Sequence, residues 1–93
     1  MPAFSRVEAE TLMVQVAGWE LNAEAKAISK NFKFKDSAQA LSFVNKIGEI
    51  AESEEHHPDI ELGWGRVKIS LTTHAIKGLS ENDFIMAAKI DEL

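Results

Sequence analysis

Two runs of alternating apolar and polar residues flank a glycine-containing break in the second half of the chain. In residues 59–62, Ile60 and Leu62 alternate with acidic residues, and in residues 66–71 an apolar side chain occupies every second position. The tripeptide Gly63-Trp64-Gly65 separates the two runs. Such alternation around a glycine-containing turn is typical of two antiparallel strands. The pattern therefore predicts a β-hairpin over residues 59–71.

All three histidines of the chain flank this predicted hairpin. His56 and His57 precede its first strand, and His74 follows its second strand. Cross-strand partners in a hairpin have residue numbers of constant sum. A turn centred between residues 65 and 66 therefore places His57 opposite His74, at about 5 Å. A slip of one residue pairs His56 with His74 instead, and either register predicts a three-histidine site at the open end of the hairpin.

Capping residues and helical periodicity predict three helices, over about 5–16, 36–54 and 80–93. Two further strands are expected at residues 19–21 and 25–34. The element order is α-β-β-α-β-β-α, which favours the α+β class. In that class, the expected arrangement is a four-stranded antiparallel sheet with three helices on one face. The chain, residues 1–93, is expected to form a single domain.

The apolar faces of two helices lead to more specific predictions. In the middle helix, Gly48 lies on an apolar stripe with Leu41 and Ile47, which suggests that the helix packs closely against the sheet at Gly48. The last helix has two apolar sides, consisting of Phe84, Ala87 and Ala88 on one and of Met86, Ile90 and Leu93 on the other. One side can face the sheet. Because large apolar patches rarely stay exposed, the second side is interpreted as a contact with another chain.

Composition argues against several classes of function. The 93 residues carry a formal net charge of −5, whereas nucleic-acid binding requires clustered lysine and arginine, so no nucleic-acid partner is expected. No apolar run approaches the roughly 20 residues that cross a bilayer, so no membrane association is expected. The chain has no cysteine, which excludes disulfides and thiolate chemistry and suits a cytoplasmic protein.

A cluster of histidines favours acid–base catalysis. Imidazole titrates near neutral pH and can therefore donate or accept a proton without large tuning. Ordinary surface or capping histidines are the alternative for any one of them, but three at one end of a hairpin favour a functional site. Metal binding is not predicted, because His56 and His57 point to opposite sides of an extended chain and no zinc-motif spacing occurs.

The sequence resembles the pterin-4a-carbinolamine dehydratase family over nearly its whole length. The resemblance rests on a spaced set of residues typical of that family, namely Glu52, His56-His57-Pro58, Trp64, His74 and Asp83. The segments Phe32-Lys33-Phe34-Lys35-Asp36 and Phe43-Val44-Asn45 are also similar to the family's sequences.

The resemblance implies a dehydratase that removes water from 4a-hydroxytetrahydrobiopterin to give quinonoid dihydropterin. This reaction recycles the pterin cofactor of aromatic amino acid hydroxylases, so the pterin is the substrate and no separate cofactor is implied. By the resemblance, His56, His57 and His74 are catalytic, with His57 and His74 as the proton-transferring pair. The implied substrate-binding residues are Glu52, Pro58, Trp64 and Asp83.

Two of these residues have alternative interpretations. Asp83 either orients His74 or simply caps the last helix, whose first turn favours acidic side chains. Trp64 either forms the wall of a ring-binding cleft or packs inside the protein.

The resemblance also implies partners. Family members form homodimers or homotetramers, and their chemistry suggests a functional link to an aromatic amino acid hydroxylase. Some animal members act as transcriptional coactivators. The alternative function is therefore a non-catalytic protein-binding module on the same scaffold.

Overall fold

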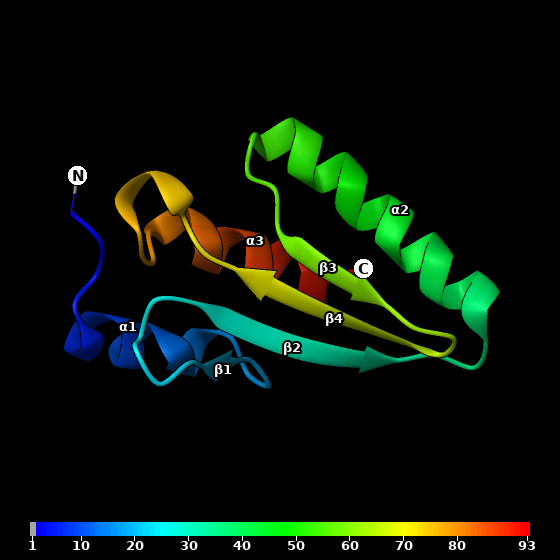
Figure 1. Cartoon of the computed structure of the whole chain (residues 1–93), viewed down its shortest axis with the longest axis horizontal. Coiled ribbons are helices and arrows are strands. Elements are labelled where there is room, and N and C mark those ends of the chain that lie inside the picture. Colours follow the sequence, from blue (N-terminus) through cyan, green and yellow to red (C-terminus); the bar gives the residue numbers. More distant parts are fainter. Residues whose placement is uncertain (1) are drawn as a thin grey trace.

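A four-stranded antiparallel sheet in the spatial order β1-β2-β4-β3 forms one layer of the computed structural model, which describes residues 2–93. The strands are β1 (Glu20–Leu21), β2 (Ile28–Lys33), β3 (Asp59–Leu62) and β4 (Arg66–Leu71). The helices are α1 (Arg6–Leu12), α2 (Ser37–Glu54) and α3 (Glu81–Asp91), with 3-10 turns at Met13–Gln15 and His74–Ile76. The helices cover one face of the sheet (Figure 1). The predicted α+β architecture and element order are confirmed.

Local capping explains where the helices begin and end. The Ser5 Oγ accepts a hydrogen bond from the Glu8 N–H at 3.2 Å, and the Glu8 carboxylate accepts one from the Ser5 N–H at 2.8 Å. Asp36 accepts from the Gln39 N–H at 2.9 Å at the start of α2. The left-handed conformation of Glu55, with φ of 53°, ends α2 just before the histidines. Between residues 2 and 93, no helix is both long and apolar enough to cross a membrane.

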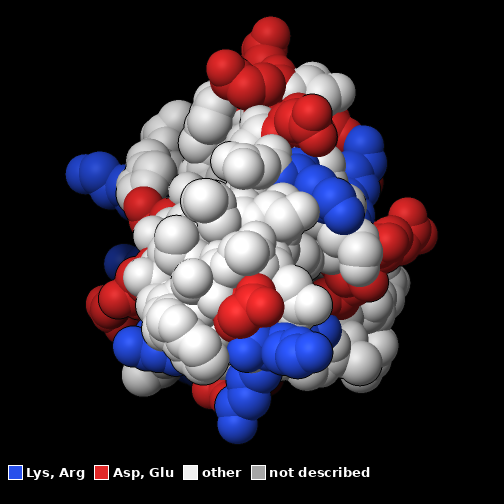
Figure 2. Space-filling view, turned by 90° about the vertical axis from the view of Figure 1, so that its right-hand side faces the viewer, with Lys and Arg blue, Asp and Glu red and all other residues white. Residues whose placement is uncertain are grey.

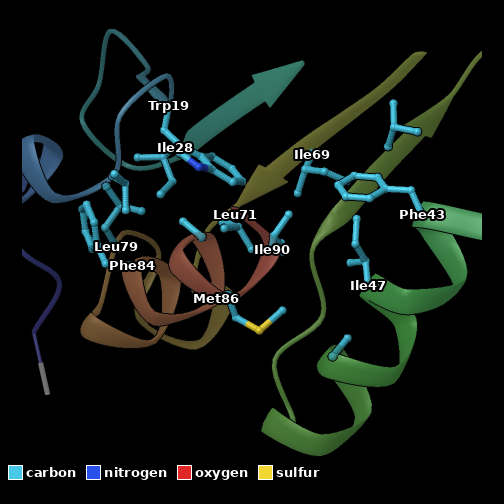
Figure 3. Close-up of a cluster of buried hydrophobic side chains, with 14 of the residues drawn as sticks. Trp19, Ile28, Phe43, Ile47, Ile69, Leu71, Leu79, Phe84, Met86 and Ile90 are labelled. Atoms are coloured by element: carbon cyan, nitrogen blue, oxygen red, sulfur yellow. The ribbon is translucent and has the colours of Figure 1, made fainter. Parts of the chain in front are cut away.

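The core lies between the sheet and the helices (Figure 3). Alternate residues of β4 point into it, and all three of these side chains are fully buried: Val67, Ile69 and Leu71. The polar residues between them, Lys68 and Ser70, face the other side of the sheet. This division agrees with the alternation in the sequence.

The sequence predicted that Met86, Ile90 and Leu93 of the last helix contact another chain, and this prediction is wrong for Met86 and Ile90. Met86 and Ile90 are each 1% exposed and belong to the chain's own core, together with Phe84 and Ala87. The helix packs against both α2 and β4, so its buried face is wider than one stripe. Only Leu93, at 47% exposure, remains accessible from the predicted contact.

The apolar stripe of α2 also differs from the prediction. Phe43 and Ile47 are buried against the core, whereas Leu41 is 49% exposed. A Cβ atom added at Gly48 would have no neighbour within 4 Å. The prediction that α2 packs closely against the sheet at Gly48 is therefore wrong. The buried face is rotated toward Phe43, which forms aromatic pairs with Phe32 and Phe34 of the sheet layer at 4.7 and 4.9 Å between ring centroids.

Candidate active site

The hairpin formed by β3 and β4 has a different register from the one predicted. Asp59 pairs with Ser70 and Leu62 pairs with Val67. The Gly63 N–H donates to the Arg66 carbonyl at 2.8 Å, so the turn is centred one residue earlier than expected. Extending this register would place His57 opposite position 72. The predicted cross-strand pair of His57 and His74 is therefore wrong.

His56 is anchored to a buried carboxylate. Its Nε2 lies 2.5 Å from Oδ1 of Asp83, and the two side chains are 12% and 0% exposed. His56 follows the left-handed residue that ends α2, whereas Asp83 lies in the first turn of α3. The fold thus brings together residues 27 positions apart, from the ends of two helices.

Asp83 has two further hydrogen-bond donors. Its Oδ2 accepts from the Thr73 hydroxyl at 2.8 Å and from the Ser80 N–H at 3.0 Å. The bond from the Ser80 N–H confirms that Asp83 caps α3. The same carboxylate also orients a histidine, but that histidine is His56 and not His74. Asp83 therefore has both roles that the sequence offered as alternatives, capping α3 and orienting a histidine, with His56 in place of His74.

His57 forms a second carboxylate pair, which lies in water. Its Nε2 is 2.9 Å from Oε2 of Glu52, and the side chains are 65% and 80% exposed. Glu52 lies near the end of α2, close to the residues that lead into β3. Adjacent histidines thus have contrasting surroundings, because one is fixed on a buried carboxylate and its neighbour is accessible.

The remaining predicted site residues divide between the two ends of the hairpin. His74 begins the 3-10 turn that follows β4, where it is exposed, and Pro58 precedes β3. Trp64 lies in the turn at the other end and is 73% exposed. At about 3.3 Å per strand residue, the seven positions from His57 to Trp64 span roughly 20 Å. Trp64 is therefore not packed inside its own chain, and it does not lie beside the histidines of that chain.

Two hydroxyl residues of the site were not identified from the sequence. Thr73 bonds Asp83, and its Oγ1 lies 2.7 Å from the Ser80 Oγ. Both residues are adjacent to predicted elements, since Thr73 precedes His74 and Ser80 caps α3. That adjacency is a local signal, but only the fold shows that the two hydroxyls meet.

Two of the three histidines, His57 and His74, are exposed on the surface. Within residues 2–93, no group of three histidine or acidic side chains is arranged to hold a metal ion. A hollow of about 530 Å³ lies between α2 and α3, and its lining includes Ile50, Lys89 and Leu93 but no histidine. A substrate at the histidines would therefore remain accessible from solvent or would be covered by another molecule.

Comparison with known proteins identifies the family. The family model described as pterin 4 alpha carbinolamine dehydratase matches residues 2–93. A relative from Halorhodospira halophila is 52% identical over 88 residues, covering 95% of this chain and 81% of the relative. One from Methylococcus capsulatus is 50% identical over 93 residues, covering 100% and 82%. Both are described, provisionally, as pterin-4-alpha-carbinolamine dehydratases.

Solved structures agree with this assignment. A transcriptional coactivator/pterin dehydratase from Brucella melitensis has a TM-score of 0.91 at 31% identity, covering 97% of this chain and 96% of its own. A pterin dehydratase-like protein identified as a RuBisCO assembly factor in the alpha-carboxysome has a TM-score of 0.70 at 25% identity, covering 81% and 87%. The fold, the spaced histidine residues and the match over residues 2–93 show that the chain belongs to the pterin 4 alpha carbinolamine dehydratase family.

Proposed function

We propose that the protein is a dehydratase that converts 4a-hydroxytetrahydrobiopterin to quinonoid dihydropterin by histidine acid–base catalysis. The observation that carries this proposal is the placement of His56 on the buried carboxylate of Asp83, next to the accessible pair of His57 and Glu52. A fixed imidazole beside an accessible one suits a reaction in which protons are both given and taken. The product would still need a two-electron reduction by another enzyme before it could serve an aromatic amino acid hydroxylase again.

The reaction has a simple proton balance. An imidazolium protonates the departing 4a-hydroxyl, which leaves as water, and a neutral imidazole accepts the proton lost from the ring. Each such positioned transfer contributes typically about 10²–10⁴-fold to the rate. We assign these transfers to His57 and His74, whose exposed side chains can reach a substrate, with His56 fixed on Asp83.

The test is the rate of dehydration of 4a-hydroxytetrahydrobiopterin, followed by absorbance. Wild type should exceed the buffer rate, and His56→Ala, His57→Ala and His74→Ala should each fall at least about tenfold, which is below the full contribution of one proton transfer. Lys33→Ala is a suitable control, because that residue is exposed on the sheet away from the histidines. A folded wild type that does not accelerate the reaction would refute the dehydratase proposal.

A protein-binding module is the second candidate function. It is favoured by the exposed apolar residues Trp64, at 73%, and Leu62, at 49%, which lie together at the hairpin turn. One structural relative is described as an assembly factor, so the fold serves binding in that protein. The same assay separates the two candidates, because a binding module has no requirement for the histidines.

We also propose that the protein forms a homo-oligomer. β3 lies at an edge of the sheet, so one side of its backbone has no partner strand among residues 2–93. Figure 2 shows the end of the molecule that carries the hairpin turn, where a central uncharged surface is bordered by charged side chains. An edge strand beside exposed apolar residues supports self-association.

A further inference from the structure

The hydroxyl groups of Ser80 and Thr73 continue the contacts of Asp83 away from the histidine. The Ser80 Oγ lies 2.7 Å from the Thr73 Oγ1, which in turn lies 2.8 Å from Oδ2 of Asp83. Oδ1 of the same carboxylate holds the His56 Nε2 at 2.5 Å. Four side chains from three segments, namely the α2–β3 link, the residues that follow β4 and the start of α3, thus form one connected series.

The donors in this series have a fixed direction. A carboxylate carries no proton and therefore only accepts hydrogen bonds, as Oδ2 of Asp83 does from Thr73 and from the Ser80 N–H. Thr73 must therefore donate its single hydroxyl proton to Asp83, so the contact between the two hydroxyls requires Ser80 to donate to Thr73. By the same argument, His56 donates from Nε2. Its Nδ1 is the ring nitrogen left for a substrate.

We propose that Thr73, supported by Ser80, is a positioning residue that holds the Asp83 carboxylate so that His56 keeps its proton on Nε2 and presents Nδ1 to the substrate. This inference rests on the proposed dehydratase function. Two donors on one carboxylate oxygen fix the plane of the carboxylate more firmly than a single donor does. Asp83 is held on Oδ2 by Thr73 and the Ser80 N–H, which leaves Oδ1 directed at His56.

The test compares Thr73→Val with Thr73→Ser. Valine has nearly the shape of threonine but lacks the hydroxyl, and the backbone bond from the Thr73 N–H to the Gly78 carbonyl, at 2.8 Å, does not depend on the side chain. Serine restores the hydroxyl. Thr72→Val is the matched control, because the Thr72 hydroxyl donates to the carbonyls of Lys26 and Gly78 and not to Asp83.

Two measurements are made on each variant. Proton NMR should show the Nε2–H of wild-type His56 as a far-downfield, slowly exchanging signal. The signal should move upfield and exchange faster in Thr73→Val only. The dehydration assay should show kcat/KM falling about tenfold in Thr73→Val, a part of the 10²–10⁴-fold of acid–base catalysis. Thr73→Ser and Thr72→Val should stay within about threefold of wild type.

The other outcomes overturn either this proposal or the proposed function. An unchanged His56 signal in Thr73→Val would show that Thr73 does not position His56, whatever the rate. An equal loss in Thr72→Val would assign the effect to general destabilisation. A wild type that shows the expected signal response but no dehydration would instead refute the proposed function, so the two failures can be told apart.

Discussion

Two carboxylate–imidazole pairs lie side by side in the chain, and they differ in how much water reaches them. Asp83 is fully buried and His56 nearly so, whereas Glu52 and His57 are mostly exposed. Exposed ion pairs contribute about 0–1 kcal/mol to stability because water screens them and ordering long side chains costs entropy. A buried carboxylate with three donors is costly to disturb, because the donors lose their partner without gaining water.

This contrast predicts different outcomes for the same chemical change. Asp83→Asn replaces one carboxylate oxygen with an NH₂ group, which cannot accept a hydrogen bond from His56, Thr73 or the Ser80 N–H. The dehydration rate should therefore fall at least about tenfold, as expected when an imidazole loses its orienting carboxylate. The melting temperature should fall as well. Glu52→Gln should leave the melting temperature nearly unchanged, because its pair with His57 is exposed. Stopped-flow absorbance and thermal unfolding of the two variants would check this, and a large effect of Glu52→Gln would show that the exposed pair has a direct part in the reaction.

At the scale of elements, local signals in the sequence predicted most of the fold. The caps at Ser5, Asp36 and Ser80 place the helix starts, because a cap depends only on residues three positions away. Alternation likewise revealed both strands of the hairpin. The register was predicted wrongly, because the Gly63-Trp64-Gly65 tripeptide alone does not fix the centre of the turn. The turn is centred one residue earlier than predicted, as the hydrogen bond from the Gly63 N–H to the Arg66 carbonyl shows, and this shifts each cross-strand partner by two positions.

The candidate site was predictable only in part for the same reason. The histidines are close in sequence and were found there. The partner of His56 is 27 residues away, in the first turn of α3, so no local pattern pairs them. The wide buried face of α3 was also missed, because the sequence does not say that α2 covers one flank of it.

Gly48 gives a prediction on the stability of α2. A Cβ added there meets nothing within 4 Å, and alanine is favoured over glycine in a helix interior by about 1 kcal/mol. Gly48→Ala should therefore raise the melting temperature by roughly 4–8 °C, as expected for a domain of this size. Gly78→Ala is the contrasting control, because its Cβ would lie 2.6 Å from the Ala3 Cβ and should destabilise the protein. A decrease for Gly48→Ala in thermal unfolding would mean that another molecule packs at this position.

For the whole molecule, Trp64 poses a geometric problem. It belongs to the spaced set of residues that resembles the family, yet it lies at the opposite end of the hairpin from the histidines of its own chain. Antiparallel pairing of two β3 edges about a two-fold axis brings the turn of one copy toward the open end of the other. A two-fold axis at Ile60 places Trp64 opposite His56 of the second copy, and an axis at Glu61 places it opposite Pro58, since residues on the same face must be opposed.

Complementation can test whether Trp64 acts across copies. Light scattering should first give a mass of two or four times the 10.3 kDa of one chain. Trp64→Ala should remain folded, because the side chain is 73% exposed, but should bind the pterin more weakly. When Trp64→Ala and His56→Ala chains are refolded together, half of the sites in a mixed dimer combine an intact His56 with an intact Trp64 from the other chain. Activity should then recover to about a quarter of wild type for random pairing. If Trp64 acts only within its own chain, every site in the mixture lacks one of the two residues, and mixing would give no recovery.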